Sequence, residues 1–164
     1  MGLKDFLQQR QDDIDLGKGV WRRAHDRFKR GIDRFHQILE QLPSGATLEL
    51  VVPEANRLAD LLPRVRSIAQ AAQSLAPSQG NDVPYSPAGI YADLHRDLSK
   101  AGNAVALCAE ALAMTRCASS CALSCQRELA VQRRVQSVVR HVCAAEEKLE
   151  QARLQEGSAP GAAV

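Results

Sequence analysis

Aromatic residues are scarce in this sequence, which has only three Phe, two Tyr and one Trp among its 164 residues. The apolar fraction is nevertheless an ordinary 45%, so a core has to be built mainly from Leu, Val, Ile and Ala. Ala-rich stretches such as 69–72 and 104–113 favour closely packed helices. A chain of this length fits one domain and can bury its core without metals or disulfides.

Long apolar runs are absent as well. No stretch approaches the ~20 apolar residues of a membrane span, and the N-terminus has no apolar segment of a secretory signal. The five cysteines are an odd number, and without a signal they favour reduced thiols over disulfides. These features predict a cytoplasmic protein.

Motifs of known catalytic chemistry are missing too. The sequence contains no glycine-rich phosphate loop, no HExxH zinc motif and no Glu-x-x-His motif of the kind that di-iron bundles use. The net charge of +2 is too small a surplus to indicate a nucleic-acid partner. We therefore expect a non-enzymatic protein with no cofactor and no small-molecule substrate.

The clearest pattern in the chain is a heptad repeat over residues 18–42. Apolar or small residues recur at alternating spacings of three and four: Trp21, Ala24, Phe28, Gly31, Phe35, Ile38 and Leu42. This spacing predicts one helix with a single apolar seam. Pro43 and Gly45 mark its end.

Three further apolar stripes predict helices over 53–76, 87–115 and 121–155. Residues 46–52 are rich in β-branched and Leu side chains but have no partner strand. They are either an extended connection or the first turn of the next helix. Pro63 interrupts its stripe without changing the phase, which favours one kinked helix over two separate helices.

The predicted fold is all-α, an antiparallel up-and-down four-helix bundle. Residues 1–17 form a short N-terminal amphipathic arm, residues 18–156 the helical bundle, and residues 157–164 a flexible tail.

The stripes of the last two predicted helices disagree in phase across residues 116–124. A turn near 117–121 explains the disagreement, because the Ser and Cys residues clustered there are poor helix formers. The alternative is a single helix of about 70 residues, roughly 100 Å long, which requires a partner chain to cover its apolar seam.

Four cations of the first predicted helix form a candidate partner-binding face: Arg22, Arg23, Lys29 and Arg30. They lie on heptad positions away from the apolar seam, where they can meet an acidic protein or an anionic membrane surface. The alternative is a solvated face with internal pairing, because Asp26 and Asp33 follow Arg22 and Lys29 by four residues.

The N-terminal arm offers a second surface. Its apolar residues fall on one edge of a helix, with Lys4 and Arg10 beside them: Leu3, Phe6, Leu7 and Ile14. Such an edge can lie in a membrane interface, or it can dock on the bundle or fray.

A cysteine cluster offers the third candidate. Cys117, Cys121 and Cys125 repeat every four residues, and thiolates at that spacing on a helix can share a Cu(I) or Zn(II) ion. The alternative is that these small side chains fill an Ala-rich interior, which is the usual place of a free Cys.

The function that this sequence favours is a non-enzymatic scaffold or adaptor acting through protein–protein association, with a protein partner or with copies of itself. The two alternatives are a thiol-based Cu(I)- or Zn(II)-binding protein and a peripheral protein of an anionic membrane surface.

Under the thiol-based alternative, protein purified with reductant carries a stoichiometric Cu(I) or Zn(II) ion, and Cys117→Ser combined with Cys121→Ser removes it. Native mass spectrometry reports the bound mass and the number of subunits together. A wild-type spectrum without a metal-sized adduct contradicts this alternative.

Overall fold

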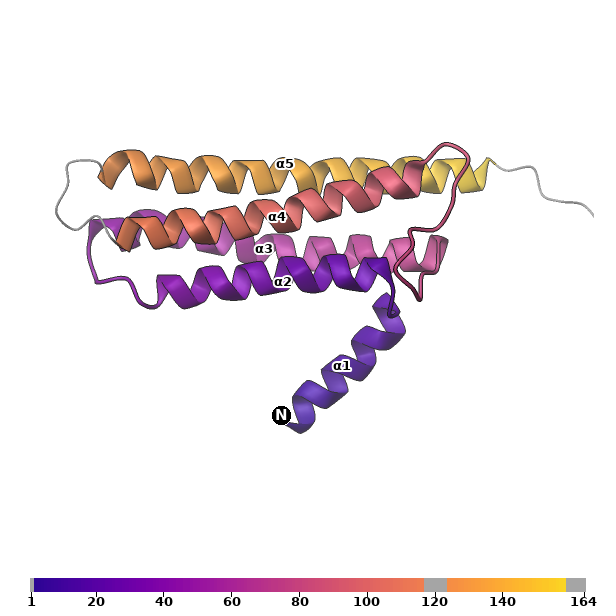
Figure 1. The fold of residues 1–164 in the computed structure, drawn as a ribbon, viewed down its shortest axis with the longest axis horizontal. Coiled ribbons are helices and arrows are strands. Elements are labelled where there is room, and N and C mark those ends of the chain that lie inside the picture. The colour runs from indigo at the N-terminus through magenta and orange to yellow at the C-terminus, as the bar shows by residue number, and fades with distance from the viewer. Residues whose placement is uncertain (1, 117–123, 159–164) are drawn as a thin grey trace, which may run out of the picture.

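Five α-helices make up the part of the chain that the computed structural model describes, residues 2–116 and 124–158. In chain order they are α1 (Leu3–Leu16), α2 (Val20–Leu39), α3 (Ala46–Leu75), α4 (Ile90–Arg116) and α5 (Ser124–Gly157) (Figure 1). The described residues include no strand, so the protein is all-α there. None of these helices has an apolar stretch that is long enough to cross a membrane.

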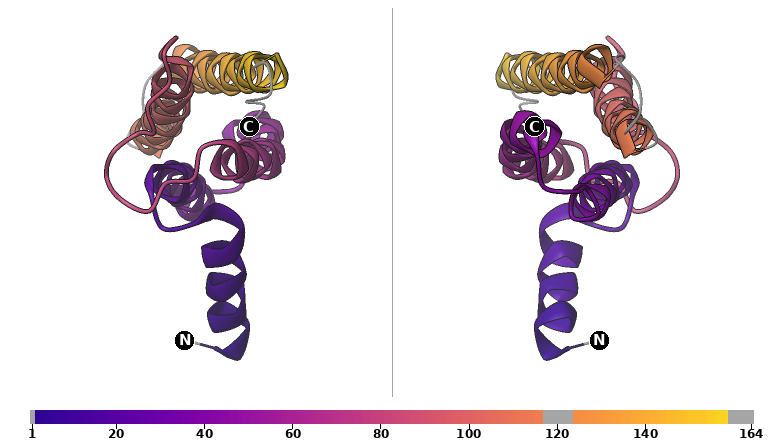
Figure 2. Two further views of the ribbon diagram at one scale, coloured as in Figure 1. Left: turned by 90° about the vertical axis from the view of Figure 1, so that its right-hand side faces the viewer. Right: turned by 90° about the vertical axis from the view of Figure 1, so that its left-hand side faces the viewer.

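The four long helices lie side by side as a bundle, whereas α1 leans away from one end of it (Figures 1 and 2). Helix α2 packs against α3 and α4, and α5 packs against the same two helices. Helices α3 and α4 are consecutive in the sequence but scarcely touch. They therefore occupy opposite corners of the bundle, and residues 76–89 connect them across its end.

This diagonal connection is held against the start of α2 by hydrogen bonds. Gly19 precedes α2 and has no side chain to cap it, and Ser78 supplies the missing acceptor: the backbone N–H of Val20 donates to its Oγ at 3.2 Å. The indole Nε1 of Trp21 donates to the carbonyl oxygen of Ala76 at 2.9 Å. The connection thus satisfies one of the free N–H groups of the first turn of α2.

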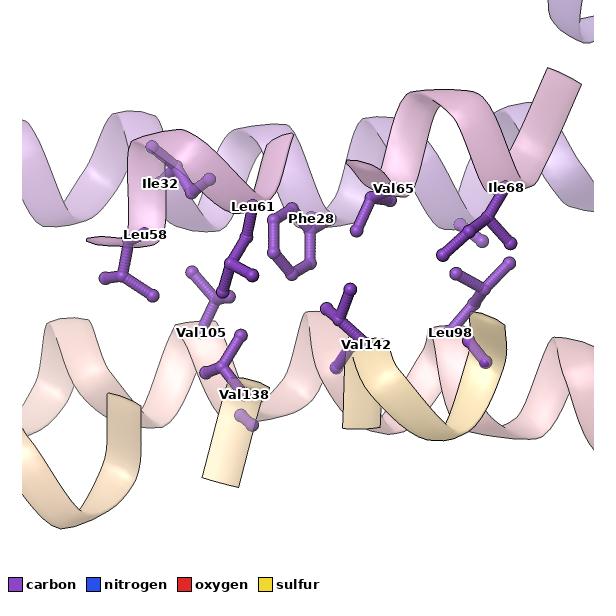
Figure 3. Packing of buried hydrophobic residues seen from close by; sticks show 14 of the residues in the cluster. Phe28, Ile32, Leu58, Leu61, Val65, Ile68, Leu98, Val105, Val138 and Val142 are labelled. Atoms are coloured by element: carbon purple, nitrogen blue, oxygen red, sulfur yellow. The ribbon is translucent and has the colours of Figure 1, made fainter. Parts of the chain in front are cut away.

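The core draws on all four long helices. The predicted seam of α2 is buried, with Trp21, Phe28 and Phe35 fully removed from solvent. Aliphatic side chains of the other helices belong to the same cluster and are shown near Phe28 in Figure 3, including Leu61 of α3 and Val138 of α5. Burying one such side chain contributes about 1.5–3 kcal/mol, so this seam is a main source of stability.

Of the two alternatives for residues 46–52, the structure confirms the helical one. They form the first turns of α3, which continues through Pro53 and Pro63 as one helix. A proline leaves the carbonyl four residues earlier without its helical donor. Both prolines lie on the exposed side of α3, where water can bind that carbonyl.

Helices α4 and α5 pack against each other along their length. This arrangement excludes the single helix of about 70 residues, whose length would be about 100 Å. The predicted turn itself lies outside the described residues, as does the predicted tail beyond residue 158.

Two glycines bring α2 and α4 close together. A Cβ on Gly31 would lie 2.7 Å from Cγ1 of Val105, and a Cβ on Gly102 would lie 3.2 Å from Cγ and Cδ of Arg27. The first neighbour is a stiff β-branched side chain packed in the core. The second is the stem of a flexible arginine on the surface.

We expect Gly31→Ala to destabilise the protein by about 1–3 kcal/mol, because overpacking outweighs the better helix propensity of Ala. Gly102→Ala is the matched control, and there the arginine can move aside. We expect it to be neutral or to stabilise by up to about 1 kcal/mol. Urea unfolding measures both. Equal stability of the two variants would contradict the close approach at Gly31.

Candidate binding groove between α2 and α4

A stripe of arginines runs along the exposed side of α2 next to α4. The spacing of four, three and four residues places all of them on one helix face: Arg23, Arg27, Arg30 and Arg34. All four side chains are exposed. Eleven residues of helix separate the first from the last, a distance of about 16 Å.

These arginines border a groove. Its larger part has a volume of about 570 Å³ and lies beside Arg27, Arg30 and Arg34. A smaller part of about 280 Å³ lies beside Arg23, Arg27, His95 and Ser99. Because both parts share Arg27, we treat them as one feature, the α2–α4 groove.

Small side chains form the floor of the larger part. Helix α4 contributes mainly glycine and alanine, and α2 contributes one glycine and one isoleucine: Gly102, Ala106, Ala109, Ala113, Gly31 and Ile38. The glycines let the two helices approach, and the alanines are too short to fill the space above them. The result is an apolar trough with a cationic rim.

The rim is poor in negative charge. The carboxylates of α2 lie toward its other side, where Asp26 binds Arg22 and Asp33 binds Lys29. Glu110 is the one acidic residue among those that line the groove. Among the described residues, no ion pair joins a carboxylate to an arginine of the stripe.

His95 does not add to this charge at neutral pH. It lies edge-on to Trp21, with 6.1 Å between the ring centroids. Burial lowers the pKa of His95, and the positive charges of Arg23 and Arg27 lower it further. The cationic character of the groove therefore comes from the arginines.

The structure divides the four cations that the sequence singled out. Arg23 and Arg30 border the groove, whereas Arg22 and Lys29 make the two i,i+4 ion pairs, at 2.8 and 3.3 Å, that the alternative interpretation expected. The candidate face chosen from the sequence left out Arg27 and Arg34, which also line the groove. Their spacing with Arg23 and Arg30 was visible, but nothing local indicated that α4 lies beside that face.

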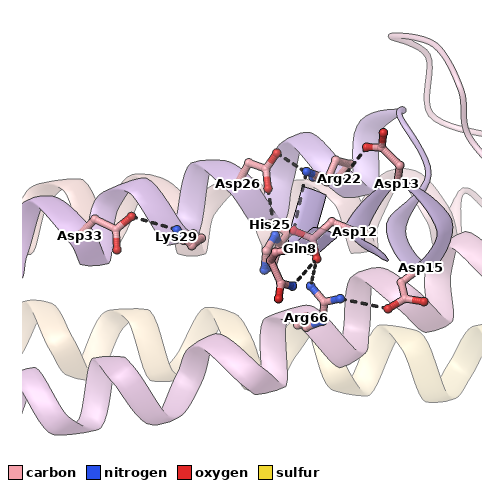
Figure 4. Close-up of polar contacts among 10 residues, drawn as sticks. All are labelled: Gln8, Asp12, Asp13, Asp15, Arg22, His25, Asp26, Lys29, Asp33 and Arg66. Atoms are coloured by element: carbon pink, nitrogen blue, oxygen red, sulfur yellow. Dashed lines mark hydrogen bonds and ion pairs between the residues drawn. The ribbon is translucent and has the colours of Figure 1, made fainter. Parts of the chain in front are cut away.

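Arg22 belongs to an ionic cluster that holds α1 against α2 and α3 (Figure 4). Its guanidinium lies 3.1 Å from Asp13 and 3.7 Å from Asp12. Arg66 of α3 pairs with Asp12 and, at 3.0 Å, with Asp15. The acidic end of the predicted arm thus lies on the bundle, and Arg22 is occupied within the protein.

The candidate metal-binding cysteines fall where no geometry can be assigned. Cys117 and Cys121 lie outside the described residues, as does the side chain of Cys125 in the first turn of α5. Of the other thiols, Cys108 is fully buried, and burial raises its pKa to about 12. Cys143 accepts a hydrogen bond from Nη2 of Arg64 at 3.4 Å.

Compared with known proteins, the chain matches no family model, no curated protein and no solved structure. The chemistry of its surfaces is therefore the guide to its function.

The ionic cluster makes the attachment of α1 sensitive to acid. Burial alone would raise the pKa of Asp12, but hydrogen bonds from Arg66 and Gln8 and the charges of Arg66 and Arg22 lower it below its usual 3.8. A lowered carboxyl pKa stabilises the folded state above pH ~4, and that stability disappears as the pH falls through the folded value.

We therefore expect carboxyl NMR titration to give Asp12 a pKa below 3.8 in the wild type and a higher pKa in Arg66→Met. The same substitution should cost about 0.5–1 kcal/mol at pH 7, and this difference should shrink as the pH falls through the folded pKa of Asp12. An Asp12 pKa that is unchanged by Arg66→Met would show that the pair does not form in solution.

Proposed function

We propose that this protein is a non-enzymatic scaffold or adaptor, and that its α2–α4 groove binds an acidic amphipathic helix of a protein partner. The observation that carries the proposal is the stripe of four arginines above an apolar trough whose described lining residues include one carboxylate, Glu110.

The length of the stripe favours an extended ligand. A small anion needs several donors that converge on one point, whereas these guanidinium groups are spread over about 16 Å. Carboxylates that recur every three or four residues along a helix match the same spacing. A guanidinium group can bind a carboxylate through two parallel hydrogen bonds, although Nη2 of Arg23 already donates to the carbonyl oxygen of Gly80.

The trough favours a partner with an apolar side. Its floor of Gly and Ala, with Ile38 at one end, can receive the apolar side chains of a helix laid between α2 and α4. Binding of single-stranded nucleic acid relies on aromatic side chains that stack on bases. The described residues that line the groove include no Phe, Tyr or Trp.

A rigid support suits this role. We take α2 to α5 to be an antiparallel up-and-down four-helix bundle, acting in the cytoplasm. Support comes from the chain entering and leaving successive long helices at alternate ends of the bundle (Figure 1) and from free thiols at Cys108 and Cys143. The groove is then bordered by two helices anchored in one core.

The test uses a synthetic helical peptide of 18 residues, with Glu on one face and Leu beside it. We expect Arg27→Glu, Arg30→Glu and Arg34→Glu together to weaken its binding at least tenfold in fluorescence anisotropy, because the charge of the rim is reversed. Raising the salt from 50 to 200 mM should weaken wild-type binding as well.

The matched control carries the same charge change outside the groove, at the exposed residues Lys100, Arg133 and Arg140. With all three replaced by Glu, the affinity should stay within about twofold of the wild type, because none of the three lines the groove and salt weakens attraction over longer distances. An equal loss of peptide affinity in both triple variants would indicate that the peptide is attracted by the overall positive charge and not by the groove. No peptide binding by the wild-type protein would contradict the proposal.

A further inference from the structure

Helix α1 turns an apolar stripe away from the bundle. Phe6, Leu7 and Ile14 are 54%, 55% and 76% exposed, and their spacing places them on one side of the helix. In Figure 1, the C-terminal end of α1 adjoins the bundle, and the N-terminal turns of α1 stand apart from the four long helices.

The contacts of α1 with the bundle come from other sides of the helix. Leu16 is fully buried, and Asp12 and Asp15 bind Arg66. Ile14 is two residues, or more than half a helical turn, from both Asp12 and Leu16. Its side chain therefore points away from the side of α1 on which Asp12 and Leu16 contact the bundle. The apolar stripe is therefore a free ridge and not an incomplete part of the core.

Two cations lie next to the ridge. Lys4 and Arg10 are exposed, and the guanidinium of Arg10 lies over the Phe6 ring, 5.9 Å from its centroid. The nearby carboxylate of Asp13 is paired with Arg22. A convex apolar ridge with cations beside it matches the boundary between acyl chains and anionic headgroups.

We propose that α1 is an anchor helix that lies in the headgroup region of an anionic lipid bilayer. Phe6, Leu7 and Ile14 enter the apolar boundary, while Lys4 and Arg10 bind lipid phosphates and carboxylates. The stems of these two cations can lie along the ridge with their charged ends toward the headgroups.

Charge also argues against a second copy of the chain as the occupant. Two ridges brought face to face would place the Lys4 and Arg10 side chains of both copies around one apolar contact, and like charges oppose such pairing. A lipid surface instead supplies the opposite charge. It also deforms around a ridge, whereas a protein partner requires a complementary groove.

A single short amphipathic helix binds a bilayer weakly and reversibly. The anchor therefore works where the protein is concentrated, or where its α2–α4 groove is already held by a partner, since linked contacts multiply affinity. The anchor does not depend on that groove, because the ridge and the arginine stripe share no residue.

The experiment is flotation of the full-length protein with vesicles of phosphatidylcholine and phosphatidylserine in a 7:3 ratio, and with vesicles of phosphatidylcholine alone. We expect wild-type protein to float with the anionic vesicles. Phe6→Ser with Leu7→Ser should reduce the bound fraction at least tenfold, and Lys4→Glu with Arg10→Glu should do the same. These side chains are exposed, so the variants keep the fold.

Leu154→Ser is the matched control, because it removes another large exposed apolar side chain, 69% exposed, from α5. It should leave flotation unchanged. Equal loss with Leu154→Ser and with the Phe6 and Leu7 variant would overturn the proposal, as would wild-type protein that stays unbound.

Two further outcomes would also overturn it. If reversing Arg27, Arg30 and Arg34 abolishes flotation while the Phe6 and Leu7 variant still floats, the groove and not α1 binds lipid. If sedimentation shows a lipid-free dimer that the Phe6 and Leu7 variant loses, the ridge binds a second copy. Binding of the acidic peptide by the Phe6 and Leu7 variant tests the α2–α4 groove separately, so the two proposals can fail independently.

Discussion

The burial of one face of α2 is the constraint on which the rest of this structure depends. Trp21, Phe28 and Phe35 are three of the six aromatic residues of the chain, and all three are fully buried on the face of α2 that packs against α3 and α4. Because that face is committed to the core, the polar residues of α2 are left on its two flanks. One flank carries paired charges that hold α1, and the other carries the arginines that border the groove.

The diagonal placement of α3 and α4 connects the fold to the candidate site. With α4 beside α2, Gly31 lies against Val105, and the helices come close enough for Arg27 to lie over Gly102. This placement requires a connection that spans the end of the bundle. Two hydrogen bonds donated by α2 hold that connection, from the backbone of Val20 to Ser78 and from the indole of Trp21 to Ala76. The same contacts that order residues 76–89 therefore also set the walls of the groove.

The two proposed surfaces both combine cations with apolar side chains, but one is concave and the other is convex. In the groove, arginines stand above small apolar residues and leave a concave site for an acidic helix. On α1, large apolar side chains project beyond the cations and form a convex ridge that suits a lipid surface. Arg22 and Arg66 lie between the two proposed surfaces, where they bind three carboxylates of α1, those of Asp12, Asp13 and Asp15.

Features that depend on neighbours within a few turns of helix could be predicted from the sequence. The seam of α2, the i,i+4 ion pairs of Arg22 and Lys29, and the all-α class follow from a repeat of 3.6 residues per turn, which is readable locally. The tertiary structure alone decided which helix covers each face. It placed Arg27 and Arg34 beside a trough, drew Arg22 into a cluster with α1, and made residues 46–52 helical against their β-prone composition. The reason is physical: helix adjacency depends on contacts such as Gly31 with Val105, more than seventy residues apart in the chain, and no local period encodes them.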